Sequence, residues 1–121
     1  MSCTHLPHDH GHEAKHLLEK MPEGATFQQM AELFHQLGDG SRLQLFWLLC
    51  HCEECVINLA AMMGMSSPTL SHHLRLLKES GLIVSRRSGK EVYYKAADTD
   101  SARVLHDALE AIMAITCPKE E

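Results

Sequence analysis

The chain has 121 residues, of which 45% are hydrophobic and 22% charged, and its formal net charge is −5. This composition is typical of one globular domain and excludes a disordered or fibrous chain. No apolar run approaches the length of a membrane-spanning helix, and the first twenty residues lack the apolar core of an export signal. We therefore expect a cytoplasmic protein without membrane contact. Its five cysteines then favour thiol or metal chemistry over a disulfide framework.

In chain order, the predicted elements begin with a polar segment. Residues 1–25 hold five of the ten histidines and are interrupted by two prolines and two glycines. This pattern predicts a flexible His- and Cys-rich amino-terminal arm, with a short helical segment over residues 12–20. One domain over residues 26–121 follows the arm. Its first helix is predicted over residues 26–37, where apolar residues recur at helical spacing.

The rest of the domain is predicted as four helices and two strands. Ser41 is the expected cap of a mostly apolar helix that reaches Cys50. A short helix over residues 56–63 and a longer one over 67–80 follow, and Pro68 marks the start of the second. Residues 82–87 and 91–96 alternate as two strands of a hairpin, and residues 98–116 form a last amphipathic helix. The predicted fold is mainly α with a β-hairpin, in the order α-α-α-α-β-β-α.

The short helix, the turn at Gly64 and the next helix are typical of a helix-turn-helix, whose second helix reads DNA bases. Residues 66–95 carry six basic and two acidic side chains, a net charge of +4, so the rest of the chain carries −9. A basic segment on an acidic chain indicates contact with nucleic acid. We therefore predict a winged helix-turn-helix bound to double-stranded DNA. The predicted DNA contacts are Ser67, Thr69, Ser71, His72, Arg75 and Lys78 on the helix and Arg86, Arg87 and Lys90 on the hairpin.

Three segments of the chain resemble the ArsR/SmtB family of metal-sensing bacterial repressors. They are the run from Asn58-Leu-Ala-Ala-Met-Met-Gly to Ser80-Gly-Leu-Ile, the hairpin Arg86-Arg-Ser-Gly-Lys-Glu-Val-Tyr-Tyr, and Leu37-Gly-Asp-Gly-Ser-Arg-Leu. The resemblance covers residues 26–116. It implies a homodimer, built largely on the first and last helices, that represses a metal-resistance operon and leaves its operator when the effector binds.

The resemblance also implies where an effector could bind. One family site is a C-V-C-D-L pattern at the start of the third helix, completed by ligands from the amino-terminal arm. Cys55-Val-Ile-Asn-Leu falls on this pattern and keeps its first cysteine alone. A second family site uses two pairs of residues on the last helix. Asp98 and Asp100 hold the first pair, but Ala111 and Ala114 fall on the second pair, so we expect this site to be absent.

The cysteines before the third helix are the predicted metal ligands. Residues three apart on a continuous helix share a face and residues two apart do not, so Cys52 and Cys55 could hold one ion together. Cys50 follows Phe46 at core spacing and is the weaker candidate. The arm offers Cys3, His5 and His8 as further ligands. Two or three thiolates with an imidazole suit Zn²⁺, Cd²⁺ or Pb²⁺, and three thiolates alone suit arsenite equally well.

The sequence thus predicts a dimeric repressor that releases operator DNA when a thiophilic metal ion binds. Two alternatives stay open: a regulator of the same fold that senses oxidants or reactive sulfur through its cysteines, and a metal-buffering protein whose arm is the functional part. No catalytic motif is recognisable, so we expect neither an enzyme nor a small organic substrate. His106 and Glu110 share one face of the last helix at positions i and i+4, which we interpret as a surface pair.

Overall fold

The computed structural model describes residues 6–8, 10, 11 and 13–116, which fall into two units, Met1–Ala31 and Glu32–Glu121. In the first unit, helix α1 (Glu13–Lys20) confirms the short helical segment predicted there. Helix α2 (Gly24–Gln36) begins two residues before the predicted start and crosses from the first unit into the second. No helix of the described residues is long and apolar enough to cross a membrane.

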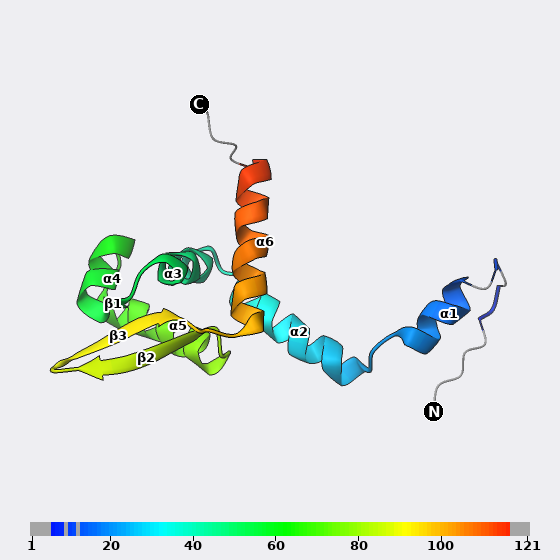
Figure 1. Cartoon of the computed structure of the whole chain (residues 1–121), viewed down its shortest axis with the longest axis horizontal. Coiled ribbons are helices and arrows are strands. Elements are labelled where there is room, and N and C mark those ends of the chain that lie inside the picture. The colour runs from blue at the N-terminus through cyan, green and yellow to red at the C-terminus, as the bar shows by residue number, and fades with distance from the viewer. Residues whose placement is uncertain (1–5, 9, 12, 117–121) are drawn as a thin grey trace. The chain divides into compact units, whose positions relative to one another are not determined.

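The second unit contains the predicted helix-turn-helix and hairpin (Figure 1). Helix α3 (Gly40–His51) is followed by the short strand β1 (Glu54–Cys55), and helices α4 (Val56–Met63) and α5 (Ser67–Glu79) form the helix-turn-helix. Strands β2 (Ile83–Ser88) and β3 (Glu91–Ala96) form the hairpin, and helix α6 (Asp100–Thr116) ends the described chain. The winged helix-turn-helix prediction is therefore confirmed.

One core holds these elements together. Leucines at positions i, i+4 and i+7 place Leu70, Leu74 and Leu77 on one face of α5, and each is at most 1% exposed. They pack with buried residues of α3, α4, the hairpin and α6, chiefly Leu45, Phe46, Leu49, Leu59, Leu82, Ile83 and Ala102. Burying a leucine or phenylalanine stabilises a fold by roughly 1.5–3 kcal/mol, so this cluster fixes the orientation of α5.

The predicted cap of α3 is wrong by two residues. Asp39 is the residue that caps the helix, and its Oδ1 accepts a hydrogen bond of 3.0 Å from the backbone N–H of Arg42. The side chain of Arg42 in turn donates to the carbonyl oxygen of Gln36 at the end of α2 (2.8 Å). Asp39 caps α3 in place of Ser41 because its carboxylate lies one residue before the first helical turn, where the free backbone N–H groups point.

The sheet has a strand that the sequence did not predict. Its order is β1-β3-β2, all antiparallel, and β1 pairs Glu54 with Tyr94 and Cys55 with Tyr93. At the other edge, β2 and β3 pair from Ile83 opposite Ala96 to Ser88 opposite Glu91, which leaves a two-residue turn. Gly89 takes a φ of 63° at the first turn position, where glycine is favoured. The segment that carries the cysteines is therefore hydrogen-bonded to the hairpin.

Candidate nucleic-acid interface and metal sites

The outer face of α5 is exposed and polar. All six residues of the helix predicted to touch DNA are exposed, on the side away from the buried leucines. Ser66 caps the helix by accepting a hydrogen bond from the backbone N–H of Thr69, and its hydroxyl donates to the Thr69 hydroxyl at 2.9 Å. The remaining small side chains at the helix start, Ser67 and Ser71, allow a close approach to base edges.

Two hydrogen bonds fix the basic side chains of α5. The guanidinium of Arg75 donates to Nδ1 of His72 at 2.7 Å, because a guanidinium has no acceptor. The ammonium of Lys78 donates to the hydroxyl of Ser85 in β2, also at 2.7 Å, and so joins the helix to the hairpin.

The three predicted hairpin cations have different surroundings. Arg86 donates two hydrogen bonds to the carboxylate of Glu53, at 2.9 and 2.8 Å, and lies 4.9 Å from the centre of the Tyr93 ring. These hydrogen bonds hold the pKa of Glu53 below its usual value. Within the described residues, Arg87 and Lys90 are exposed and have no ion-pair partner. Arg87 and Lys90 are thus the two cations of the three whose charge no described carboxylate neutralises, whereas Arg86 joins the hairpin to the segment before α4.

The cysteines do not share a helix face, so the geometric argument for pairing Cys52 with Cys55 is wrong. Helix α3 ends at His51, and Cys52 is its extended cap, with φ −150° and ψ 163°. Cys55 lies in β1, where it is 8% exposed and precedes the first turn of α4. The chain must extend over this stretch because β1 pairs with β3. Helical spacing therefore does not apply between the two thiols.

Burial changes the chemistry of two of these thiols. Cys50 packs against the core, and burial, with a smaller contribution from the charge of Glu110, raises its pKa to about 11. Burial also raises the pKa of Cys52, with a smaller contribution from Glu54. A protonated thiol is a poor nucleophile and must lose its proton to bind a metal ion. Cys50 is thus a partly buried residue that packs against the core, in agreement with its spacing from Phe46.

The arm residues named as ligands are only partly described. Cys3 and His5 lie outside the described residues. His8 belongs to the first unit, is exposed, and stacks on the ring of His10 with ring centres 5.7 Å apart.

The acidic pair at the start of α6 is already paired with a basic side chain. Asp98 and Asp100 both form ion pairs with the guanidinium of Arg103. Ala111 and Ala114 are exposed and offer no ligand atoms. The absence of the family's second site stays a prediction.

A cluster that the sequence analysis missed joins α3 to α6. Nε2 of His51 lies 3.1 Å from Oε1 of Glu110, Nε2 of His106 lies 3.0 Å from the same oxygen, and the two nitrogens are 3.2 Å apart. Burial raises the pKa of Glu110, but hydrogen bonds from His106 and His51 outweigh this and leave it below its usual value. The i, i+4 spacing of His106 and Glu110 was visible in the sequence, whereas their contact with His51 required the tertiary fold.

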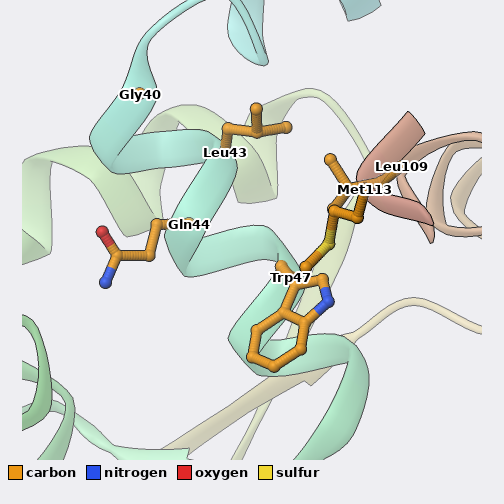
Figure 2. A pocket seen from close by; sticks show the side chains of 6 residues that line it. All are labelled: Gly40, Leu43, Gln44, Trp47, Leu109 and Met113. Carbon is orange, nitrogen blue, oxygen red and sulfur yellow. The ribbon is translucent and has the colours of Figure 1, made fainter. Parts of the chain in front are cut away.

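Trp47 lies beside this cluster. The centre of its ring lies 4.5 Å from the centre of the His51 ring, one helical turn further along α3. Figure 2 shows Trp47 next to Leu109 and Met113 of α6, with which it lines an apolar pocket that also includes Leu43 of α3. The same packing of α3 on α6 therefore positions the imidazole of His51.

Comparison with known proteins places the chain in a family. The model of the bacterial regulatory protein arsR family matches residues 39–85. A transcriptional repressor SmtB homolog of Synechocystis is 49% identical over 59% of this chain, a match that spans 54% of that protein. A cadmium resistance transcriptional regulatory protein, CadC homolog, of Staphylococcus aureus is 33% identical over 87% of this chain and 84% of its own length.

A solved structure gives the same result for the fold. The homodimeric winged helix-turn-helix DNA-binding domain of a possible ArsR-family regulator from Mycobacterium bovis is 30% identical, with a TM-score of 0.69. The alignment covers 80% of this chain and 89% of that domain. The helix-turn-helix and hairpin of the structure agree with these similarities. The chain belongs to the ArsR/SmtB family of bacterial transcriptional repressors.

Proposed function

We propose that this protein is a dimeric, metal-responsive repressor that acts on operator DNA in the cytoplasm. The observation that carries the proposal is the exposed polar face of α5, held in place by three buried leucines and flanked by Arg87 and Lys90 of the hairpin. A helix of this kind enters the major groove, while cations beside it bind phosphates. Operator DNA is therefore the proposed partner, and no small organic substrate is needed.

Apolar side chains left exposed on α6 support the dimer. Val104, Ile112 and Ile115 are between 59 and 82% exposed, and Phe34 on α2 is 65% exposed. Such a set is costly in a monomer and is typical of a surface that another chain covers. A second copy is the proposed occupant because two recognition helices would then reach successive major grooves.

The proposed effector is a thiophilic metal ion, of the Zn²⁺, Cd²⁺ or Pb²⁺ class, or arsenite. The name of the cadmium-resistance relative and the thiols at the start of α4 support this assignment. Cys52 and Cys55 are the proposed ligands in this segment, with Cys3, His5 and His8 of the arm as further donors. Cys50 contributes least, since burial keeps its thiol protonated.

The test is operator release measured by fluorescence anisotropy on labelled DNA from upstream of the protein's own gene. Each of the four effectors is added separately to the metal-free protein. We expect one of them to weaken DNA binding by about 5–150-fold, the usual range of allosteric coupling. Absence of specific DNA binding would refute the repressor and favour a metal buffer. Release by an oxidant in the presence of a chelator would refute the metal effector and favour thiol oxidation.

Serine variants test the ligands. Cys52→Ser and Cys55→Ser should abolish release, while metal-free DNA affinity stays within about threefold, because neither side chain lies on the exposed face of α5. Cys50→Ser is the matched control: it should keep release and lower the free energy of unfolding by about 1–2 kcal/mol, since it places a hydroxyl in the core. If Cys55→Ser released DNA normally, the thiol of Cys55 would not be a ligand of the effector.

A further inference from the structure

We propose that His51, His106 and Glu110 form a binding site for a divalent cation of the Zn²⁺ class, which fastens the end of α3 to α6. Among the described residues, these three are the only group of three or more His, Cys, Asp or Glu side chains whose ligand atoms all lie within 4.8 Å of one another. None of the cysteines belongs to it. The site differs from both family sites considered above in its residues and in the helices that it joins.

The first argument is the pattern of hydrogen bonds. An ionised carboxylate only accepts, and the Nε2 of a neutral imidazole either donates or accepts. If both imidazoles donate to Glu110, the two N–H groups oppose each other across 3.2 Å. If one imidazole instead carries its proton on Nδ1, the lone pair on its Nε2 faces the carboxylate oxygen. One of the three close contacts is therefore unfavourable without a cation, whereas a cation binds all three lone pairs.

The second argument is the geometry of the donor atoms. The two nitrogens and the oxygen form a nearly equilateral triangle with sides of 3.0, 3.1 and 3.2 Å. Ligand atoms at about 2.0–2.1 Å from a tetrahedral Zn²⁺ lie about 3.3–3.4 Å apart, so the triangle needs to widen by only about 0.2 Å. Two imidazoles and one carboxylate are ligands that Zn²⁺ accepts, and they leave a fourth position open.

The surroundings allow a cation to enter and hold the ligands in place. The side chains of His51 and Glu110 are 44% and 42% exposed, so the site can be reached without unfolding. Trp47 packs beside Leu109 and Met113 of α6 (Figure 2). Its ring also contacts the His51 ring and limits its orientation. A pocket whose lining includes Cys50, Asp98 and His106 lies on one side of the His106 ligand.

A cation at this place would connect two parts of the fold that the proposed function requires. Helix α3 ends at His51 and leads through β1 into α4, the first helix of the helix-turn-helix. Helix α6 carries the exposed apolar residues of the proposed dimer surface. The regulatory consequence of the cluster rests on the proposed function, but the binding of the cation does not.

The experiment measures binding of Zn²⁺ and Co²⁺ to the full chain and to His106→Gln, Glu110→Gln and the control His35→Gln. His35 is an exposed histidine of α2 outside the cluster. Isothermal titration gives the number of ions bound, and long-range ¹H–¹⁵N spectra of the imidazoles show which histidines change. We expect zinc to shift the Nε2 resonances of His51 and His106 in the wild type and in the control. His106→Gln and Glu110→Gln should weaken this site at least about tenfold, because loss of an outer-sphere partner alone costs that much.

A Cys52→Ser/Cys55→Ser variant separates this proposal from the preceding one. It should lose operator release but keep the cation at the cluster, and its Co²⁺ complex should show visible bands without thiolate charge transfer. Circular dichroism and metal-free DNA binding check that every variant is folded. Equal zinc binding by His106→Gln and wild type, or imidazole resonances of His51 and His106 that do not respond to zinc, would overturn the cation site whatever the result for operator release.

Discussion

Arg86 and Glu53 offer a direct test of how the hairpin meets DNA. Arg86 lies in the basic hairpin, but its Nε and Nη2 donate hydrogen bonds to the Glu53 carboxylate at 2.9 and 2.8 Å. Replacing Arg86 by alanine alone leaves the Glu53 carboxylate without its partner beside the DNA, so Arg86→Ala should weaken binding by repulsion. Replacing both, as Glu53→Gln/Arg86→Ala, leaves the net charge unchanged and should restore affinity to within about threefold of the wild type.

Arg87→Ala is the matched comparison because Arg87 has no ion-pair partner among the described residues. Each phosphate contact adds about 0.9 to the slope of log affinity against log salt, which is about 1.8 for the two hairpins of a dimer. Between about 50 and 200 mM salt, that slope corresponds to a factor of about 12 in affinity. In Arg87→Ala, the fall in affinity between these two salt concentrations should therefore be smaller than in the wild type by this factor. Adding Glu53→Gln to Arg87→Ala should not restore the salt dependence.

The assay is anisotropy of labelled operator DNA at four salt concentrations near pH 7, where Glu53 is ionised because its pKa lies below the usual value. If Glu53→Gln/Arg86→Ala loses as much salt dependence as Arg87→Ala, Arg86 contacts phosphate directly and the ion pair opens on binding. That result would refute the assignment of Arg86 to joining the hairpin to the segment before α4.

Three further predictions concern stability and the unused site on α6. Leu74→Ala should lower the free energy of unfolding by about 2–5 kcal/mol in urea titrations, since Leu74 is 1% exposed. A smaller loss would mean that neighbouring core residues move to fill the space that the leucine leaves. Asp100→Ala should leave metal-dependent release unchanged because Asp100 pairs with Arg103, and loss of release would show that α6 does hold an effector. A hydrogen bond from Arg42 lowers the pKa of Asp39, so its stabilising effect is present at neutral pH and is lost as pH falls through the folded-state pKa. Melting temperatures of Asp39→Asn and wild type should therefore converge in acid, and a constant difference would contradict the cap.

Regular patterns in the sequence were enough to predict the helices and the hairpin. The leucines at 70, 74 and 77 lie at helical spacing and are buried, and the glycine at 89 falls at a turn that requires positive φ. Strand β1 was missed because two residues form no pattern, and its existence depends on a partner about 40 positions later in the chain. The same strand invalidated the helical argument for Cys52 and Cys55.

The site could be predicted only where one element carries it. The exposed face of α5 follows from helical periodicity, so its DNA contacts could be proposed residue by residue. The partners Glu53 of Arg86 and His51 of His106 come from elements 33 and 55 positions away. No local spacing indicates such contacts, because they depend on how α3, the hairpin and α6 pack in space.

Strand β1 sets a limit on how strongly an effector can act. Two residues of β1 pair with Tyr93 and Tyr94, and Glu53 just before them pairs with Arg86, so only a short stretch joins the cysteine segment to the hairpin. Such a local connection can open while the core of the domain stays folded. A ligand bound at Cys55, as proposed, would therefore act on this local connection rather than on the whole fold. The free energy that the proposed effector could transmit to the helix-turn-helix would then be limited to the cost of opening this short connection.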